Sequence, residues 1–303
     1  MSEFRSVVPV TLEWFGCATF RLTIGDVVVF LDAYIDRVEG ADGPGVRADD
    51  IDHADYVLVG HSHFDHLWGA ERIAPRTGAT IIGSYETVRV MAAHGVAESQ
   101  LLAVSGGERV RLGPGITVTV YPSLHSCVWT GPFEQPDVVC VGDLGLTLDQ
   151  QRARLGDIAA YVAQLDPAGR AHLAAARQGE RGDGGALVFV IETPAGSVLY
   201  QDTSGHWSGL LKGLRPDVAI LAAAGRGNID GEPIQGSLAD FLVREVGFLE
   251  PRTVVLGHHD NWLPGFSIST DLTPVRAAFA SAAPATRLLE LAYGEPVALF
   301  GAT

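Results

Sequence analysis

The alternation of apolar and polar residues predicts a chain built mainly of short β-strands with helices between them. The segments 8–14 and 19–32 are rich in Val, Ile, Phe and Thr, and Gly25-Asp26 suits a tight hairpin turn within the second. Similar strand-like segments occur at 56–59, 77–83, 107–120, 186–193, 197–200, 218–222, 253–257, 287–291 and 297–300. Helical spacing of apolar residues predicts helices at 85–94, 237–246 and 274–281. Gly95 and Gly247 are predicted to end the first two helices.

One segment does not follow this pattern. Residues 146–185 contain two helical stretches, 150–165 and 171–176, which are separated by Asp166-Pro167-Ala168-Gly169 and followed by a glycine-rich run. We predict a single domain over residues 1–303 that carries this segment as a helical insertion.

The residues most suggestive of a functional site come directly after the strand-like segment 56–59. There, His61-Ser62-His63-Phe64-Asp65-His66 brings four potential metal ligands together directly after a glycine that ends a buried strand. His61 and His63 are two residues apart, so in an extended segment they project to the same side. The side chains of the neighbours Asp65 and His66 point in different directions, which would let them bind a second metal ion. Imidazole and carboxylate ligands suit zinc, and iron or manganese nearly as well.

The run His61-Ser62-His63-Phe64-Asp65-His66 resembles the signature of the metallo-β-lactamase fold superfamily of metal-dependent hydrolases. This resemblance implies an α/β fold, a four-layer αββα sandwich in which two mixed β-sheets are flanked by helices. It also implies a dinuclear metal site at one edge of the sandwich. Within the superfamily, the chain looks most like the branch of L-ascorbate 6-phosphate lactonase and the N-acyl-phosphatidylethanolamine phospholipase D enzymes. The features that suggest this branch are the polar segment at His125-Ser126 and the strand-Gly ending before His258.

The resemblance also implies where the remaining ligands lie, each of them after a strand. His125 stands where the third ligand of the first metal ion belongs, and Asp202 stands where a carboxylate bridges both ions. The last ligand is His258 or His259, and we prefer His258 because it is the first residue past its strand. The resulting sets are His61, His63 and His125 for one ion, Asp65, His66 and His258 for the other, and Asp202 as the bridge.

Four further residues are expected to support the metal ligands or to contact the substrate. Asp32 ends an apolar strand, where the resemblance implies an aspartate that supports the metal-binding loop from behind. For His206, contact with the substrate and support of a metal ligand from outside are equally open roles. His259 is a candidate for contacting the substrate. Arg226 is the cation best placed to bind an anionic substrate group, because an Arg side chain binds two oxygens at once.

Composition and charge narrow the choice of partners. The chain has 303 residues, 47% of them hydrophobic, so it can bury a large core. Its formal net charge of −15 argues against nucleic acid or an anionic membrane as a partner, since both require clustered Lys and Arg. The sequence has no apolar run of membrane-spanning length, no N-terminal signal-peptide pattern and no C-x-x-C pair. We therefore expect a cytoplasmic protein that acts on a small molecule, with homo-oligomer formation left open.

These features predict a dinuclear metal-dependent hydrolase. Two divalent ions per chain, expected to be Zn²⁺ with Mn²⁺ or Fe²⁺ as alternatives, would share a hydroxide that attacks an electrophilic carbonyl or phosphorus. Asp65 is the expected catalytic proton carrier. Because cations near the expected site are few, we expect the substrate to be a small cyclic ester (a lactone) or a related ester or amide. The alternatives are a phosphodiesterase of the same fold and a non-haem iron oxidoreductase such as a persulfide dioxygenase.

The choice between the two neighbouring histidines can be tested by substitution. We expect His258→Ala to lose one of two bound metal ions, because it removes a ligand that the second ion needs. His259→Ala should keep both ions and change only rate or affinity. The measurement is the metal content of the two purified variants by elemental analysis, and the reverse pattern would assign the ligand to His259.

Overall fold

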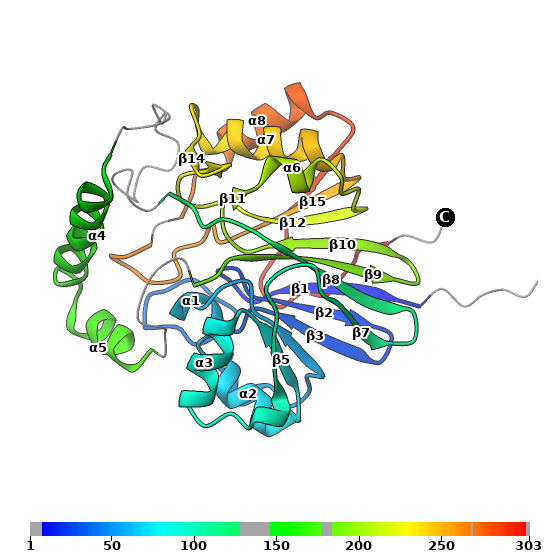
Figure 1. Ribbon diagram of the computed structural model, residues 1–303, viewed down its shortest axis with the longest axis horizontal. Coiled ribbons are helices and arrows are strands. Elements are labelled where there is room, and N and C mark those ends of the chain that lie inside the picture. The colour runs from blue at the N-terminus through cyan, green and yellow to red at the C-terminus, as the bar shows by residue number, and fades with distance from the viewer. Residues whose placement is uncertain (1–7, 128–145, 177–183, 268, 301–303) are drawn as a thin grey trace, which may run out of the picture.

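The computed structural model describes residues 8–127, 146–176, 184–267 and 269–300. Two sheets of seven strands each pack face to face, and helices cover their outer surfaces (Figure 1). The strand order is β17-β1-β2-β3-β4-β5-β6 in the first sheet and β16-β15-β12-β10-β9-β8-β7 in the second. Both sheets mix parallel and antiparallel pairs. The arrangement confirms the four-layer αββα sandwich expected from the sequence.

The elements have the following bounds. The first sheet contains β1 (Val10–Trp14), β2 (Phe20–Ile24), β3 (Val27–Leu31), β4 (Tyr56–Leu58), β5 (Thr80–Gly83), β6 (Leu101–Ala103) and β17 (Val297–Ala298). The second contains β7 (Arg109–Gly113), β8 (Ile116–Pro122), β9 (Leu187–Thr193), β10 (Gly196–Gln201), β12 (Val218–Ala222), β15 (Thr253–Gly257) and β16 (Arg287–Leu289). A small third sheet contains β11 (Gly205–His206), β13 (Asn228–Ile229) and β14 (Glu232–Pro233). The helices are α1 (Phe64–Leu67), α2 (Ala70–Thr77), α3 (Tyr85–Ala93), α4 (Leu148–Val162), α5 (Pro167–Ala175), α6 (Ser208–Leu211), α7 (Leu238–Leu249) and α8 (Thr273–Ala282), with single 3₁₀ turns at Ala48–Asp50 and Glu98–Gln100.

The central strands bury both of their faces, which explains why they are apolar almost throughout. In β9, Phe189 and Ile191 point into the space between the two sheets, whereas Val188 points to the cluster beneath α7 and α8. This follows from the two-residue period of a strand, which sends successive side chains to opposite faces. A third apolar cluster lies between the first sheet and helices α2 and α3. The sandwich therefore has one core between the sheets and one beneath each helical layer.

The direction of the strands determines where the chemically active loops lie. β3, β4 and β5 run parallel to one another in the first sheet, as do β10, β12 and β15 in the second. The C-terminal ends of parallel strands meet at the same edge of a sheet. The loops that follow β3, β4, β10 and β15 therefore gather at one edge of the sandwich.

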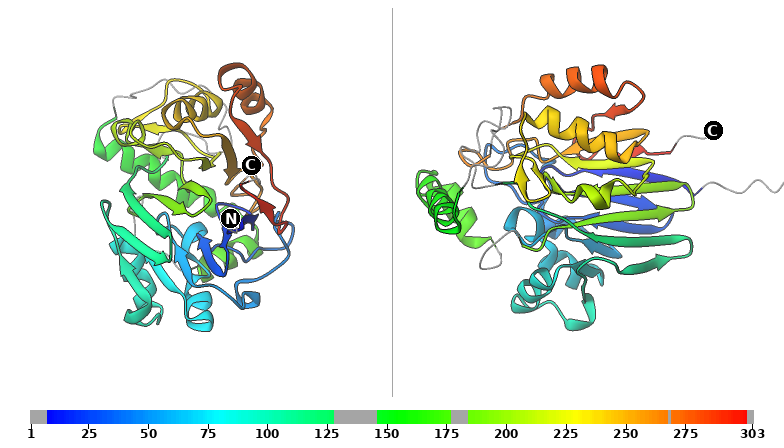
Figure 2. Two further views of the ribbon diagram at one scale, coloured as in Figure 1. Left: turned by 90° about the vertical axis from the view of Figure 1, so that its right-hand side faces the viewer. Right: turned by 45° about the horizontal axis from the view of Figure 1, so that its top comes forward.

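The predicted insertion forms two helices beside this edge, outside the sandwich (Figures 1 and 2). Helix α4 (148–162) is close to the predicted stretch 150–165, whereas α5 (167–175) begins inside the run 166–169 that was predicted to separate the helices, because Pro167 suits the first turn of a helix. The side chain of Asp166 caps α5 by accepting a hydrogen bond from the Gly169 amide. The Tyr34 hydroxyl lies 2.8 Å from Nε2 of His172, which ties α5 to the loop after β3. The glycine-rich run after α5 lies mostly outside the described residues.

The sequence-based prediction of one helix end was wrong. Helix α7 continues past Gly247 to Leu249, and Glu250 takes the left-handed conformation that ends it. Leu249 is fully buried, so its packing outweighs the weak helix propensity of the glycine. The short helices α1, α2 and α6 and the small third sheet were not predicted. Among the described residues, no helix combines the length and the apolar character needed to cross a bilayer.

The N-terminus of α7 offers a test of the fold. The Ser237 side chain accepts a hydrogen bond from the Asp240 amide, while the Asp240 carboxylate accepts one from the Ser237 amide. Ser237→Ala should lower the free energy of unfolding by about 1 kcal/mol, because the Asp240 amide loses its side-chain acceptor at the start of the helix. Urea denaturation is the measurement, and Ser237→Thr, which keeps the hydroxyl, should stay close to wild type. Equal stability of the alanine variant and wild type would contradict this account of the helix start.

Candidate metal centre

Four loops bring the seven predicted ligands to the same edge of the sandwich. The loop after β4 carries His61, His63, Asp65 and His66, and the loops after β8, β10 and β15 carry one ligand each. The amide of Leu187 donates to the Gly60 carbonyl at 2.8 Å, and the Ser62 amide donates to the Gly184 carbonyl at 3.3 Å. These hydrogen bonds fasten the first ligand loop to the second sheet.

The first predicted set forms a compact group. Nε2 of His61 lies 3.0 Å from Nδ1 of His63, and the ring of His125 is 4.8 Å from each of their rings. One potential ligand atom from each of the three residues lies within 4.8 Å of the others. The His125 loop is fixed by Asn228, whose side-chain amide donates to the His125 carbonyl at 2.8 Å. The three imidazoles are therefore positioned to bind one ion.

Asp202 lies between the two predicted sets. One of its carboxylate oxygens, Oδ2, is 2.6 Å from Nδ1 of His61 and 3.2 Å from Nδ1 of His66. Its other oxygen, Oδ1, is buried and has no hydrogen-bond partner. The carboxylate thus contacts one histidine of each set and keeps an unpaired oxygen.

Asp65, His66 and His258 form the remaining group. Oδ2 of Asp65 lies 3.3 Å from Nε2 of His258 and 3.5 Å from Nε2 of His66. His66 follows directly within α1, so its position is set by the first turn of that helix. The structure also places the thiol of Cys17 beside Asp65 and His258, within 4.8 Å of a ligand atom of each.

Cys17 was not among the residues that we selected from the sequence. It lies in the turn after β1, a strand that ends at the same edge as the ligand loops. Its position directly after a glycine that follows an apolar strand, as for His61 and His258, is a signal that could have identified it.

Asp32 lies directly behind the ligand loop. It accepts a hydrogen bond from the Gly60 amide at 2.9 Å, and its second oxygen lies 2.6 Å from Nδ1 of His66. Its backbone is left-handed, with φ of 56°. A non-glycine residue adopts this conformation at a cost of about 1–2 kcal/mol, so the surrounding contacts hold it in place.

Burial controls the charges of this cluster. Burial and the nearby His66 hold the pKa of His61 well below its usual range, and burial together with His63 lowers the pKa of His125 to about 3. These imidazoles are neutral at pH 7 and offer lone pairs to a cation. Burial also raises the pKa of Asp202 well above its usual range, and the neighbouring Asp32 adds to this rise.

The residues present fit a divalent metal ion. Neutral imidazoles and carboxylates are the donor set that zinc, iron and manganese share. The unpaired Oδ1 of Asp202 and the buried, unpaired Nδ1 of His258 are polar atoms that the protein alone leaves unsatisfied. A bound cation would offset the cost of burying the carboxylates of Asp65 and Asp202 beside neutral imidazoles.

His206 lies apart from this cluster. Its Nδ1 is 3.1 Å from the Glu245 carboxylate of α7, and its ring packs against Phe241 and Phe248. Both members of the His206–Glu245 pair are buried. These contacts connect the small third sheet to α7, and the predicted substrate contact of His206 stays a prediction.

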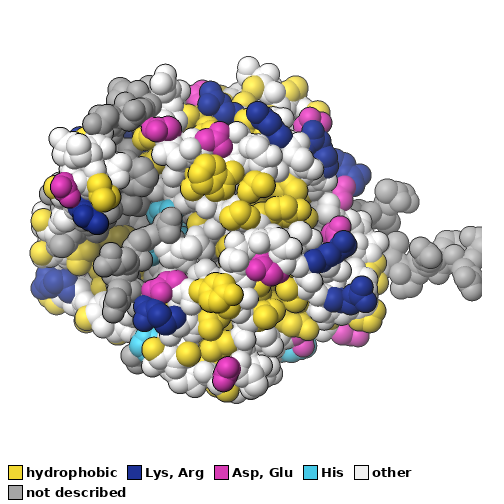
Figure 3. Space-filling model, viewed as in Figure 1, with side chains coloured by type: hydrophobic (Ala, Val, Ile, Leu, Met, Phe, Trp, Pro, Cys, Tyr) yellow, Lys and Arg dark blue, Asp and Glu magenta, His cyan; other side chains and the backbone are white. Residues whose placement is uncertain are grey.

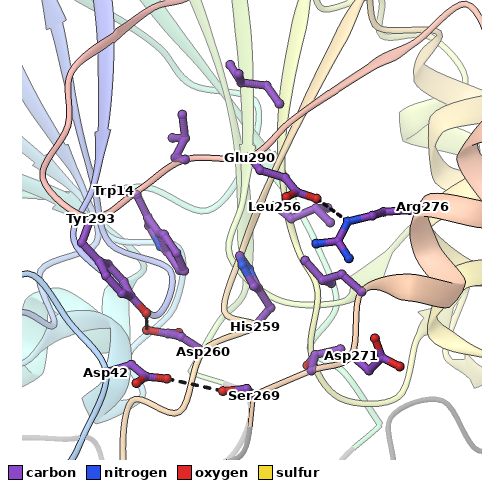
Figure 4. A pocket seen from close by; sticks show the side chains of 14 residues that line it. Trp14, Asp42, Leu256, His259, Asp260, Ser269, Asp271, Arg276, Glu290 and Tyr293 are labelled. Atoms are coloured by element: carbon purple, nitrogen blue, oxygen red, sulfur yellow. Dashed lines mark hydrogen bonds and ion pairs between the residues drawn. The ribbon is translucent and has the colours of Figure 1, made fainter.

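His259 points into a pocket beside the metal ligands (Figure 4). Its ring stacks on Trp14 with a centroid distance of 4.7 Å, and Tyr293 stacks on the same tryptophan at 4.6 Å. The pocket has a volume of about 390 Å³, and none of the seven predicted ligands is among its lining residues. His258 therefore faces the predicted metal ligands, whereas its neighbour His259 faces the pocket.

Arg226 lies in the turn after β12, and its carbonyl accepts a hydrogen bond from the Cys127 amide at 2.9 Å. A Cβ on the neighbouring Gly225 would lie 3.0 Å from the Ser126 hydroxyl, so this turn packs closely against the segment that carries His125. The structure thus brings Arg226 next to the His125 segment. On the face seen in Figure 3, histidine side chains are visible in a hollow between the body of the sandwich and the part that carries α4 and α5.

Comparison with known proteins places this geometry in a family. A sequence model described as the Beta-lactamase superfamily domain matches residues 28–165. A UPF0173 metal-dependent hydrolase from Pyrobaculum islandicum is 33% identical over 156 residues, which cover 48% of this chain and 68% of that protein. A further UPF0173 metal-dependent hydrolase, from Anaeromyxobacter sp., is 27% identical over 295 residues, which cover 95% of this chain and 86% of that protein.

The fold comparison agrees. The solved structure of Igni18, a metallo hydrolase from the archaeon Ignicoccus hospitalis, has a TM-score of 0.61 at 19% identity and covers 95% of this chain and 97% of that one. The chain belongs to the UPF0173 metal-dependent hydrolases, a family of the metallo-β-lactamase superfamily. This confirms the superfamily that the His61–His66 run indicated.

Gly60 offers a test of the site geometry. A Cβ at this position would lie 2.1 Å from the carboxyl carbon of Asp202, a distance that no real contact allows. Gly60→Ala should displace Asp202, lose bound metal and lower the free energy of unfolding by about 1–3 kcal/mol. The measurements are metal per chain and urea denaturation.

The matched control is Gly247→Ala in α7, where an added Cβ meets no atom within 4 Å. This variant should keep its metal and gain about 0.5–1 kcal/mol, because alanine favours a helix over glycine. A Gly60→Ala protein with wild-type metal content would show that Asp202 does not need this close approach.

Proposed function

We propose that this metal-dependent hydrolase uses two divalent metal ions, zinc in the first place, to hydrolyse a small, largely uncharged cyclic ester or a related ester or amide. His61, His63 and His125 would hold one ion, and Asp65, His66 and His258 the other. Asp202, which contacts His61 and His66 in the structure, would join the two groups. The donor atoms of the first group lie within 4.8 Å of one another, and in the second group Oδ2 of Asp65 lies 3.3 Å from Nε2 of His258 and 3.5 Å from Nε2 of His66.

Two bound divalent ions would supply a nucleophile at neutral pH and polarise the substrate carbonyl. The role of Asp65 follows from its own contacts. Although burial opposes ionisation, the neighbouring His66 and His258 hold the pKa of Asp65 below its usual range. The carboxylate is therefore ionised at neutral pH, and it would serve as a metal ligand that orients the attacking water by accepting its hydrogen bond. Asp32 would keep His66 in the orientation that presents Nε2 to the site.

The observation that carries the substrate proposal is an aromatic cluster beside the second group of ligands. We call it the aromatic wall, and its members are Tyr34, Phe64, Trp68, Trp262 and Phe266. Trp262 is its centre, with ring centroids 5.5 Å from Tyr34 and 5.6 Å from His258. Phe64 comes directly before Asp65 and packs 5.9 Å from Trp262. Tyr34, Phe64 and Trp262 are themselves buried, whereas Trp68 and Phe266 are partly exposed, so the wall gives the site an apolar border that favours an apolar or aromatic substrate over a charged one.

The distribution of cations supports the same choice. The two arginines that lie over rings of the aromatic wall are already engaged: Arg37 donates to the Tyr34 and Phe15 carbonyls, and Arg72 pairs with Asp36. Arg252 pairs with Asp217 at the N-terminal end of β15, whereas His258 follows the C-terminal end, roughly 17 Å away along the strand. Lys212 lies over the Phe248 ring against α7. Among the described residues, Arg226 lies next to the His125 segment, which suits a single anionic group on the substrate. A polyanionic substrate would need several cations there, against a net charge of −15.

The proposal predicts a clear order of substrates for the zinc-loaded protein. An aromatic lactone such as dihydrocoumarin should be hydrolysed with a higher kcat/KM than bis(p-nitrophenyl) phosphate, because the site offers an apolar surface and few cations. Bound metal should reach about two equivalents per chain. Asp202→Ala should lower lactone turnover by more than the roughly 10–100-fold cost of losing an outer partner of a metal ligand.

One control and two possible outcomes make the result decisive. Circular dichroism should show that Asp202→Ala stays folded, because the residue lies at a strand end rather than in the apolar core between the sheets. Cleavage of the phosphodiester without lactone turnover would overturn the substrate class and keep the metal site. A chain that binds no transition metal even after reconstitution would overturn the proposal as a whole.

A further inference from the structure

The turn that carries Cys17 is held in an unfavourable conformation by several strong contacts. Cys17 has a left-handed backbone with φ of 50° and is completely buried. Its amide donates to both carboxylate oxygens of Asp260, at 2.9 and 3.1 Å. Its carbonyl accepts hydrogen bonds from the His258 amide at 2.7 Å and from the Trp14 indole at 2.9 Å. The Cys17 turn is thereby fastened to the loop that presents His258.

These contacts place the Cys17 sulfur at the second group of ligands. Ligand atoms of Cys17, Asp65 and His258 all lie within 4.8 Å of one another, and the sulfur is 3.5 Å from the Asp65 carbonyl. His258 also has a left-handed backbone, with φ of 63°. Two adjoining loops thus adopt costly conformations that bring a thiol and an imidazole to the same carboxylate.

The spacing suits a shared ion. Zinc binds sulfur at about 2.3 Å and nitrogen or oxygen at about 2.0–2.2 Å, so two ligand atoms on one tetrahedral ion are roughly 3.3–3.8 Å apart. Oδ2 of Asp65 and Nε2 of His258 are 3.3 Å apart, and the three ligand atoms, the thiol sulfur included, lie within 4.8 Å of one another. We propose that the Cys17 thiolate is a ligand of the metal ion that Asp65 and His258 hold. This inference rests on the dinuclear site proposed above.

Binding through Cys17 would change the charge and the selectivity of the second position. As the sulfur–metal bond forms, the thiol proton leaves to bulk water, and the site gains one negative charge. A thiolate favours zinc and iron(II), whereas a position with only imidazole and carboxylate ligands also suits manganese. Cys17 would therefore make the second position prefer zinc over manganese. The aromatic wall beside it would keep water away from the sulfur.

Cobalt(II) provides a direct readout, because a cobalt–thiolate bond gives an intense near-ultraviolet charge-transfer band that imidazole and carboxylate ligands do not give. The wild-type protein, reconstituted with two equivalents of cobalt, should show this band, and Cys17→Ser should lose it. The variant should also bind its second zinc ion at least about tenfold more weakly and discriminate less between zinc and manganese, as measured by competition titration.

The other cysteines provide the matched control. Cys127 is buried in a different loop, and Cys140 lies outside the described residues. The double variant Cys127→Ser/Cys140→Ser should keep the band, because Cys17 is then the remaining thiol. Circular dichroism and retention of the first cobalt ion would show that Cys17→Ser is folded.

The outcomes separate this inference from the proposed function. Two bound cobalt ions without a charge-transfer band would overturn the role of Cys17 and leave the dinuclear site in place. The same holds if the band persists in Cys17→Ser. Absence of cobalt binding in the wild-type protein would overturn both.

Discussion

The carboxyl group of Asp202 occupies a space that exists only because residue 60 has no side chain. A Cβ there would fall 2.1 Å from the Asp202 carboxyl carbon, so the backbone before His61 lies directly against the side chain that follows β10. This approach brings a carboxylate of the second sheet against two histidines that follow the first sheet. The metal centre therefore depends on the distance between the sheets, which the apolar core between them maintains.

Strained backbone surrounds this contact. Asp32, Cys17 and His258 all follow strands, all have positive φ, and all direct a side chain toward the ligand cluster. Such conformations cost about 1–3 kcal/mol each and persist only where other contacts impose them. Here the contacts are buried hydrogen bonds, from the Gly60 amide to Asp32 and from the Cys17 amide to Asp260. The three apolar clusters of the sandwich supply the stability that makes this strain affordable.

The helical insertion packs against the loops beside the ligand cluster, so it can influence which substrate is bound. Helix α5 contacts the loop after β3 through His172 and Tyr34, and Leu173 packs against the aromatic wall. The aromatic wall beside the ligands is thus built jointly by loops at the strand ends of the sandwich and by a segment outside it. Changes in this segment would alter the substrate surface without altering the donor set.

The sequence by itself predicted the alternation of strands and helices and the cluster of candidate ligands from His61 to His66, because both depend on local pattern, whereas the αββα sandwich followed from the resemblance that this cluster carries. The two-residue period of the strands, the glycine before His61 and the glycine before His258 are visible in the chain and indicate buried strands that end in ligands. The loops that follow β8 and β10 could be assigned through the resemblance alone, since one histidine or aspartate after a strand has no distinctive pattern of its own.

The tertiary structure decided what depends on contacts between distant segments. It separated His258 from His259, which sequence places side by side, because the left-handed turn at His258 sends the two rings to opposite spaces. It placed His206 against α7, and it brought Cys17 to Asp65, 48 residues away. It also carried α7 beyond Gly247, because burial of Leu249 outweighs local propensity. Periodicity records which face of an element is buried, but the partner that covers that face is fixed only when the two sheets pack.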